Sequence, residues 1–253
     1  MSDVRTLSEA LIERLRSAKR VFALTGAGVS AESGVPTFRD ALTGLWAKFD
    51  PRELATPSAF ARNLKLVWDW SAQRRAQVRA VEPNAGHFAI AELERRVPAF
   101  LLATQNVDGL HARAGSRALV ELHGNIARVR CSRDNRIVDD WKETDDAQPP
   151  RCVACGAYLR PDVVWFEEML PQAALERAEA AAHECDVMIV AGTSGEVYPA
   201  AALPHYARAA GARVVEVNPH ETPLSRLAHD ALRGPSAVVL PSLVRAAWPH
   251  EHG

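Results

Sequence analysis

A glycine-rich loop directly follows the first apolar run of the chain. The run VFALT leads into GAGVSAESGVP, where Gly26, Gly28 and Ala31 have the G-x-G-x-x-G/A spacing that lets a backbone turn sharply beneath a pyrophosphate. The spacing alone also fits a strand-to-helix turn that binds no ligand. A plain dehydrogenase is disfavoured, because Pro36 and a polar stretch stand where its helix and second strand should follow.

Polar side chains follow two further apolar runs. Gln105, Asn106 and Asp108 come after one run, and His123 comes after the next. At the carboxyl end of a strand such amide and carboxylate groups can hold an amide or a ribose, and a histidine can act as a general base near neutral pH. The alternatives are an Asx turn that closes the strand and a structural histidine.

A second loop of small and polar residues, GTSGEVYPA at 192–200, follows the apolar run DVMIVA. Its backbone N–H groups suit contact with a phosphate. Four cysteines stand at Cys131, Cys152, Cys155 and Cys185. They are too few for a disulfide scaffold, so metal binding is the better hypothesis, with Cys185 interpreted as buried packing at the start of a core strand.

These residues need a framework of strands whose ends meet. Apolar runs of strand type lie at 21–25, 99–104, 119–122, 186–191, 213–217 and 237–240, with helical stretches at 172–184 and 198–210. Alternating strands and helices predict an α/β fold with a doubly wound parallel sheet of Rossmann type.

Two segments supply no strand to this sheet, and we expect them to form a smaller, inserted lobe that is helical and carries the cysteines. The large domain is predicted from about 1–40, 98–125 and 167–253, and the small lobe from about 41–97 and 126–166.

Composition narrows the function classes. A chain of 253 residues with 47% hydrophobic and 24% charged residues is globular rather than disordered. Thirty Lys and Arg against 31 Asp and Glu give a net charge of −1, so no basic field favours nucleic acid. No apolar run is long enough to cross a bilayer, and the first 20 residues carry charges where a signal peptide needs an apolar centre. We therefore expect a cytoplasmic protein with no membrane or nucleic-acid partner.

Five motifs together resemble the sirtuins. GAGVSAESGVPTFRD, TQNVDGLH, ELHGN, GTSGEVYPA and VEVNPHETP occur in that family's order and spacing, from about residue 20 to residue 240. The chain is most similar to the bacterial class that includes desuccinylase and demalonylase-type sirtuins. The resemblance implies NAD-dependent removal of acyl groups from protein lysine side chains, with nicotinamide and O-acyl-ADP-ribose as products, and it implies a structural zinc in the small lobe.

The resemblance also implies residue roles. His123 is the implied base toward the ribose hydroxyls, with Asn106 and Asp108 beside the nicotinamide. The implied NAD-binding residues are Gly26, Ala27, Gly28, Thr37, Phe38, Arg39, Trp46, Gln105, Asn106, Asp108, Gly192, Thr193, Ser194, Asn218 and Ser236. The implied substrate-binding residues are Ser71, Arg74, Val164, Trp165 and Phe166.

Two positions depart from the family's pattern. Its zinc site uses two C-x2-C pairs, whereas here Asp134 replaces one cysteine, leaving Cys131, Cys152 and Cys155. A site with three thiolates and a carboxylate is expected, and the alternative is a metal-free or weakly metallated lobe. Glu167 stands where the family usually has glycine in the segment that pairs with substrate, or else it is an outward-facing side chain on an edge strand.

The acyl preference depends on a helix predicted from Ser58 to about Ala80. Its apolar stripe is continued by Ser71 and Arg74. Sirtuins that prefer malonyl, succinyl and glutaryl lysine carry a Tyr and an Arg at this spacing. With the Arg kept and the Tyr replaced, we expect deacetylation plus weakened action on acidic acyl groups. The alternative is a rotated helix with Trp68 and Ala72 inward and Arg74 in solvent.

Two other functions remain open. Mono-ADP-ribosyl transfer would use the same activated ribose with a different nucleophile. A module that binds NAD without turnover would fit the loops but not the presence of both Asn106 and His123.

Overall fold

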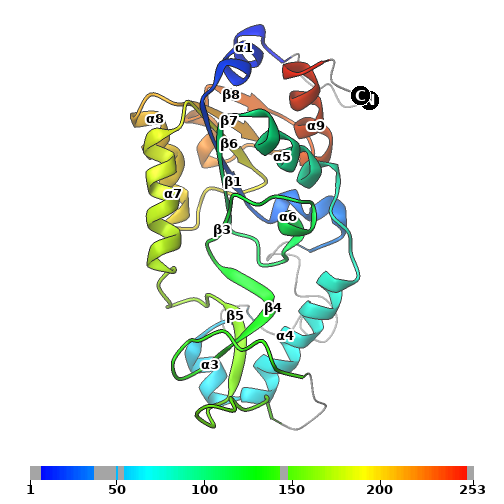
Figure 1. Ribbon diagram of the computed structural model, residues 1–253, viewed down its shortest axis with the longest axis vertical. Helices are drawn as coiled ribbons and strands as arrows, with labels where there is room; N and C mark the ends of the chain where they lie inside the picture. Colours follow the sequence, from blue (N-terminus) through cyan, green and yellow to red (C-terminus); the bar gives the residue numbers. More distant parts are fainter. Residues whose placement is uncertain (1–6, 37–49, 51–53, 143–147, 250–253) are drawn as a thin grey trace.

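The computed structural model describes residues 7–36, 50, 54–142 and 148–249. The predicted NAD-binding residues Thr37, Phe38, Arg39 and Trp46 lie outside the described residues. Figure 1 shows a larger body that contains the main sheet and a smaller body below it, joined by the chain around β3 and β4.

The main sheet has six parallel strands in the order β3-β2-β1-β6-β7-β8. From β1 the chain builds outward to β3 and then crosses back to place β6 beside β1. The strand order therefore reverses between β1 and β6, which creates a crevice at their carboxyl ends. This topology confirms the predicted doubly wound sheet. The strands are β1 (Arg20–Thr25), β2 (Ala99–Thr104), β3 (Leu119–Glu121), β6 (Val187–Ala191), β7 (Arg213–Val217) and β8 (Asp230–Leu232).

Helices cover both faces of the sheet because successive strand residues point to opposite sides. In β1, Val21 and Ala23 pack in one core with α1 (Glu9–Ser17), α5 (Ala85–Arg96) and α9 (Ser236–Ala247). Phe22 and Leu24 pack in the other core with α7 (Gln172–Glu184) and α8 (Leu203–Ala209). Figure 1 shows α7 and α8 on one side of the sheet and α5 and α9 on the other. Short elements complete this body: α6 (Leu110–Arg113), η1 (Ala27–Val29), η2 (Ala31–Ser33), η4 (Ala200–Ala202) and η5 (Pro223–Arg226).

The strand predicted at 237–240 is wrong, because these residues lie in α9. Val239, Leu240, Leu243 and Ala247 are buried at helical spacing, which a four-residue apolar run does not reveal. The last strand of the sheet is instead β8, which has only 3 residues. The helix predicted over 198–210 is also divided, into η4 and α8.

The smaller body packs two helices against a two-stranded antiparallel sheet. The single helix predicted over 58–80 is wrong, because Asn63 ends α3 and caps α4 by accepting from the Leu66 N–H at 3.0 Å. Buried tryptophans dominate its packing: Trp70 and Trp165 share one cluster, and Trp68 lies in another with the cysteines. The elements are α3 (Pro57–Arg62), α4 (Leu64–Arg79), β4 (Gly124–Cys131) and β5 (Leu159–Val163).

None of the helices in the described ranges combines the length and the apolar run that crossing a bilayer requires.

Candidate active site

Two glycine loops meet at the crevice between β1 and β6. The Gly28 N–H donates to the Gly192 carbonyl at 2.8 Å, and a Cβ on Gly28 would lie 2.8 Å from the Gly192 Cα. Gly192 has φ +61, and a Cβ there would lie 2.3 Å from the Val29 nitrogen. The glycines are therefore needed first for the close packing of the two loops, which explains their spacing before any ligand is considered. The loop after β1 continues as the short turns η1 and η2 rather than as a long helix.

Residues that follow β2, β6 and β7 are hydrogen-bonded to one another at the bottom of the crevice. Gln105 after β2 donates its amide to the Thr193 hydroxyl at 2.9 Å, and Asn218 after β7 donates to the Thr193 carbonyl at 3.0 Å. Ser194 follows and is partly buried. Ser236 begins α9 and is buried, and its hydroxyl has no hydrogen-bond partner among the described residues. An unpaired buried hydroxyl is a group that a bound polar ligand can satisfy.

The Ser30 hydroxyl connects the predicted nicotinamide residues. It donates to Asp108 Oδ2 at 2.7 Å, and it accepts from the Asn106 amide at 3.0 Å. His87 Nε2 lies 3.3 Å from the same oxygen. Asn106 and Asp108 are both 7% exposed, so their side-chain amide and carboxylate lie largely out of contact with water. Electrostatic interactions are strengthened there.

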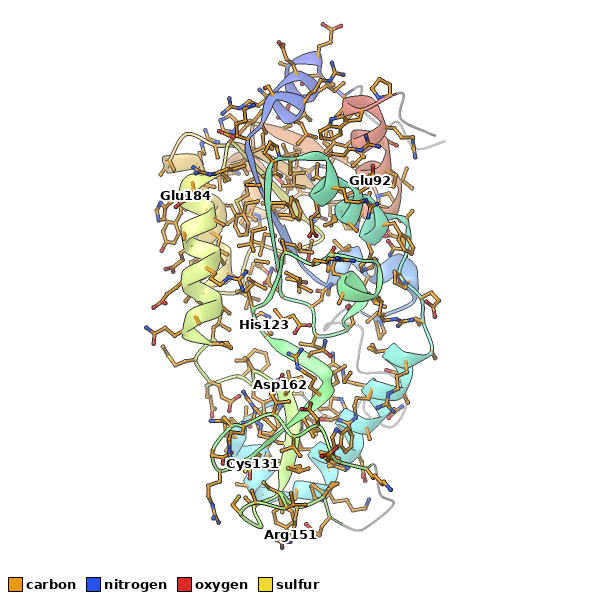
Figure 2. The ribbon with its side chains drawn as sticks, viewed as in Figure 1. Glu92, His123, Cys131, Arg151, Asp162 and Glu184 are labelled. Atoms are coloured by element: carbon orange, nitrogen blue, oxygen red, sulfur yellow. The ribbon has the colours of Figure 1, made fainter. Side chains whose placement is uncertain are left out.

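His123 lies between the two bodies, in the two-residue connection from β3 to β4 (Figure 2). Its Nδ1 lies 2.9 Å from the Gln105 carbonyl. A carbonyl only accepts, so Nδ1 carries the hydrogen and the neutral ring keeps its lone pair on Nε2. Burial lowers the pKa of His123, and the hydrogen bond to Gln105 opposes that effect. The ring is therefore held in the form of a base that can accept a proton at Nε2 near neutral pH.

Gly124 fixes His123 against the smaller body. It has φ +80, and a Cβ there would lie 2.1 Å from the Asp162 carbonyl oxygen on β5. The Val164 N–H donates to the His123 carbonyl at 2.9 Å. The predicted base and the predicted substrate segment are thus joined by a backbone hydrogen bond.

The segment after β5 forms a turn and not an edge strand. The Glu168 N–H donates to the Trp165 carbonyl at 3.1 Å, and the Phe166 N–H donates to the Ala55 carbonyl at 2.9 Å. The alternative that placed Glu167 on an edge strand, with its side chain facing outward, is therefore wrong. It has φ +71, the left-handed conformation that favours glycine, which gives a physical reason for the family's glycine at this position. Trp165 is buried and Phe166 is exposed.

Ser71 and Arg74 both lie on α4. Ser71 is buried and donates its hydroxyl to the Val67 carbonyl at 2.8 Å, which leaves only its lone pairs for another partner. Arg74 is partly buried, with its guanidinium carbon 5.0 Å from the centre of the Trp70 ring. Burial lowers the pKa of Arg74, and the carboxylate of Asp108 raises it. The negative charge of Asp108 therefore favours the charged form of Arg74.

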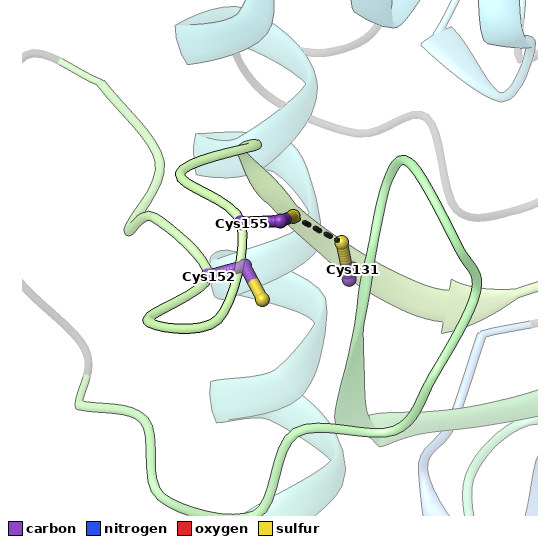
Figure 3. A group of neighbouring side chains, drawn as sticks. All are labelled: Cys131, Cys152 and Cys155. Carbon is purple, nitrogen blue, oxygen red and sulfur yellow. Dashed lines mark hydrogen bonds between the residues drawn. The ribbon is translucent and has the colours of Figure 1, made fainter.

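Three cysteines gather in the smaller body (Figure 3). The sulfur atoms of Cys131, Cys152 and Cys155 all lie within 4.8 Å of one another, and those of Cys131 and Cys155 are 3.5 Å apart. Three clustered thiols are a donor set that zinc accepts, so the residues present fit a structural zinc site. Cys185 lies apart, at the C-terminal end of α7 two residues before β6 begins. Its thiol is buried and burial raises its pKa to about 12, which agrees with its interpretation as core packing.

Asp134 stands beside this cluster but is paired with an arginine. Its carboxylate accepts from Arg136 Nε at 2.7 Å and from the Arg136 N–H at 3.1 Å. The three-thiol group found among the described residues does not include it. Whether Asp134 completes the ligand set stays a prediction.

Several residues of the site were not foreseen. Ser30 lies inside the first glycine motif, and the tilted rings of His87 and His111 lie with their centres 4.7 Å apart. Glu168 follows the substrate segment and closes its turn. No periodicity marks these residues, because their partners come from distant parts of the chain.

Open α/β sheets bind nucleotides at the point where the strand order reverses. The two glycine loops meet at this point, and Gln105 and Asn218 contact Thr193 there, so the protein is of the nucleotide-binding α/β class. A model of the Sir2 family matches residues 26–199. The chain therefore belongs to the Sir2 family, which confirms the resemblance identified in its motifs.

Relatives and solved structures agree with this membership. An NAD-dependent protein deacylase of Ralstonia nicotianae is 53% identical over 235 residues, covering 91% of this chain and 93% of that protein. One from Thermus thermophilus is 56% identical over 225 residues, covering 87% of each. A structure described as a Sir2 homolog–NAD complex has a TM-score of 0.90 at 47% identity, covering 96% of this chain and 94% of that chain. A Sir2 protein bound to a myristoylated histone peptide has a TM-score of 0.76 at 36% identity, covering 94% of each.

Proposed function

We propose that the protein removes acyl groups from lysine side chains of proteins and consumes NAD, releasing nicotinamide and O-acyl-ADP-ribose. The relatives named NAD-dependent protein deacylase and the neighbour with a bound acylated histone peptide support the reaction and the substrate class. The observation that carries the proposal is the geometry of His123. Its Nδ1 is engaged by the Gln105 carbonyl, and its Nε2 is left as a base between the two bodies.

The chain's own groups divide the work. NAD supplies the ribose carbon that receives the acyl oxygen once nicotinamide has left. Asn106 and Asp108, held by Ser30, offer an amide and a carboxylate beside the leaving group. His123 Nε2 accepts a proton from a ribose hydroxyl, since burial keeps the imidazole neutral. The glycine loops and the Ser236 hydroxyl surround the adenosine end.

The reaction is tested by mass spectrometry of purified protein incubated with NAD and a panel of acyl-lysine peptides. We expect loss of the acyl group from the peptide together with stoichiometric nicotinamide. The variant His123→Tyr, with wild-type circular dichroism, should abolish deacylation, and Asn106→Ala should slow nicotinamide release itself. Transfer of ADP-ribose to protein without deacylation would instead identify the protein as a mono-ADP-ribosyltransferase. NAD binding without nicotinamide release would identify a non-catalytic module.

For acyl preference we propose deacetylation with retained but weak action on malonyl and succinyl lysine. Arg74 keeps the cation on α4, and the negative charge of Asp108 opposes the lowering of the pKa of Arg74 by burial. Ser71 is shorter than a tyrosine and already donates to Val67, so it adds little grip on a carboxylate. The variant Arg74→Met should remove desuccinylation while sparing deacetylation. Equal loss of both activities, or no action of the wild type on succinyl peptides, would show that Arg74 is no carboxylate clamp.

A further inference from the structure

A chain of alternating charges follows the β4–β5 pair from the large body to the turn after β5. Arg128 pairs with Glu121 at 2.7 Å and with Asp162 at 2.8 Å. Beyond Asp162, Arg130 lies 3.8 Å from Asp162 and 3.4 Å from Glu168. Side chains in such a row hold one another in place, so the last member, Glu168, has little freedom of its own.

Glu168 is held most strongly by Arg160. The Arg160 guanidinium donates to both carboxylate oxygens, at 2.5 and 2.8 Å, and its carbon lies 3.4 Å from the centre of the Trp165 ring. The Arg160 side chain is 6% exposed and that of Glu168 is 21% exposed. A two-pronged pair at this depth is geometrically specific and far less screened than a surface pair.

The same carboxylate closes the turn that carries the predicted substrate residues. Glu168 Oε2 accepts from the Trp165 N–H at 2.8 Å, while the Glu168 N–H donates to the Trp165 carbonyl at 3.1 Å. These reciprocal bonds stabilise the turn and so offset the cost of the left-handed conformation of Glu167. Val164 and Phe166, on either side of Trp165, are fixed by backbone bonds to His123 and Ala55.

We propose that Glu168 is a positioning residue for the acyl-lysine substrate, which it serves by holding the backbone of residues 164–167 in one conformation beside His123. The proposal rests on the proposed deacylase function. The contacts of the Glu168 carboxylate are with Arg130, Arg160 and the Trp165 N–H, so its proposed role acts through the backbone of the turn. Its contribution is to remove, before substrate arrives, the conformational freedom that an ordered binding edge would otherwise lose on binding.

The test compares two variants at Glu168 with a matched control elsewhere. Glu168→Ala removes both the ion pair and the acceptor for the Trp165 N–H, whereas Glu168→Gln keeps an acceptor oxygen and loses the charge. Asp230→Asn is the control, because Asp230 also forms a two-pronged, partly buried pair, with Arg213, at the edge of the large sheet.

We expect Glu168→Ala to raise the KM for an acetyl-lysine peptide about tenfold, with kcat and the KM for NAD within about twofold of wild type. Glu168→Gln should raise the peptide KM by about threefold, and Asp230→Asn should leave it unchanged. An unchanged peptide KM in Glu168→Ala, or an equal rise in Asp230→Asn, would overturn the proposal.

Amide hydrogen exchange over residues 163–169 separates this proposal from the proposed function. Exchange in this segment should be faster in Glu168→Ala than in wild type and in Asp230→Asn. If wild type shows no deacylation, the proposed function fails, and the exchange rates alone then decide whether Glu168 holds the turn. Unchanged exchange in Glu168→Ala would refute that role.

Discussion

The protonation of His123 is set by one hydrogen bond and by burial of the ring. The Gln105 carbonyl fixes which nitrogen carries the hydrogen, and burial lowers the pKa of the imidazole. A lowered pKa keeps the ring neutral further into acid than the ordinary value of about 6.5. The base form is therefore available on the acid side of neutrality.

We predict that the acid limb of the deacylation rate has its midpoint below about pH 6.5, because only the neutral ring can accept the ribose proton. Single-turnover rates at saturating NAD and peptide, measured between pH 5 and 8, give this midpoint. His123→Asn should lose most of the rate and the limb with it. A limb centred at or above pH 7 in the wild type would contradict the assignment.

Gly124 gives a second prediction at the level of a single residue. In Gly124→Ala the new Cβ meets the Asp162 carbonyl, which is backbone and cannot rotate away, at a φ of +80. We expect a loss of more than about 2 kcal/mol in the free energy of unfolding, measured with urea. Gly115→Ala is the matched control, since Gly115 has φ +101 but no atom of the described residues lies within 4 Å of the added Cβ. Equal losses in the two variants would mean that the contact with β5 is unimportant.

At the level of elements, α5 and the short helix α6 bring two histidines together next to Ser30 and Thr25 of the candidate site. His87 on α5 and His111 on α6 are both buried, and burial lowers their pKa values to about 4 and about 3. In the unfolded chain both bind protons near pH 6.5. Between these values the unfolded state holds more protons than the folded state, so acid favours unfolding.

We therefore predict that the free energy of unfolding is fully present above about pH 6.5 and falls by up to about 1.4 kcal/mol per pH unit for each histidine between about pH 6 and pH 4. Urea titrations at pH 7 and pH 5 measure the loss. His111→Gln should reduce this pH dependence, whereas His183→Gln on the exposed face of α7 serves as the control. The same pH dependence in His111→Gln and wild type would refute this account.

The elements also show what the sequence could predict. The long buried strands β1, β2, β6 and β7 were found because a parallel sheet covered on both faces gives continuous apolar runs. The run at 237–240 was ambiguous, since four apolar residues fit a strand as well as one turn of α9. The Ser30 hydrogen bonds could not be predicted, because they join segments up to 78 residues apart. The motifs indicated which strand ends carry polar residues. Only the folded chain brings Ser30 into contact with Asn106 and Asp108.

At the scale of the whole molecule, the two bodies have separate cores. Among the described residues, the two clusters that flank the main sheet share no member with the cysteine cluster, in which Trp68, Val129 and Leu159 pack with Cys131 and Cys152. Trp141 packs against this cluster and meets the Trp68 ring edge-on at 5.7 Å. Zinc held by the three thiols would therefore support the smaller body while leaving the sheet to its own packing.

We predict that a zinc chelator loosens the smaller body alone. Tryptophan emission should shift to the red as Trp68 and Trp141 become hydrated, while far-ultraviolet circular dichroism, dominated by the larger body, changes little. Loss of both signals together would show that the molecule unfolds as one unit. No bound zinc in protein purified without chelator would refute the metal site and leave the NAD site untouched.

The role of position 134 can be tested in the same titration, because a ligand there would change how tightly the smaller body holds zinc. Changes that touch only the partners of metal ligands already alter metal affinity by about tenfold or more, so an added thiolate should act at least as strongly. Asp134→Cys frees the position from its pair with Arg136 and should raise the chelator concentration at half-release by at least about tenfold. Asp134→Ala separates the alternatives: it should lower that concentration if the carboxylate binds zinc, and an unchanged value would show that three thiols hold the metal without it.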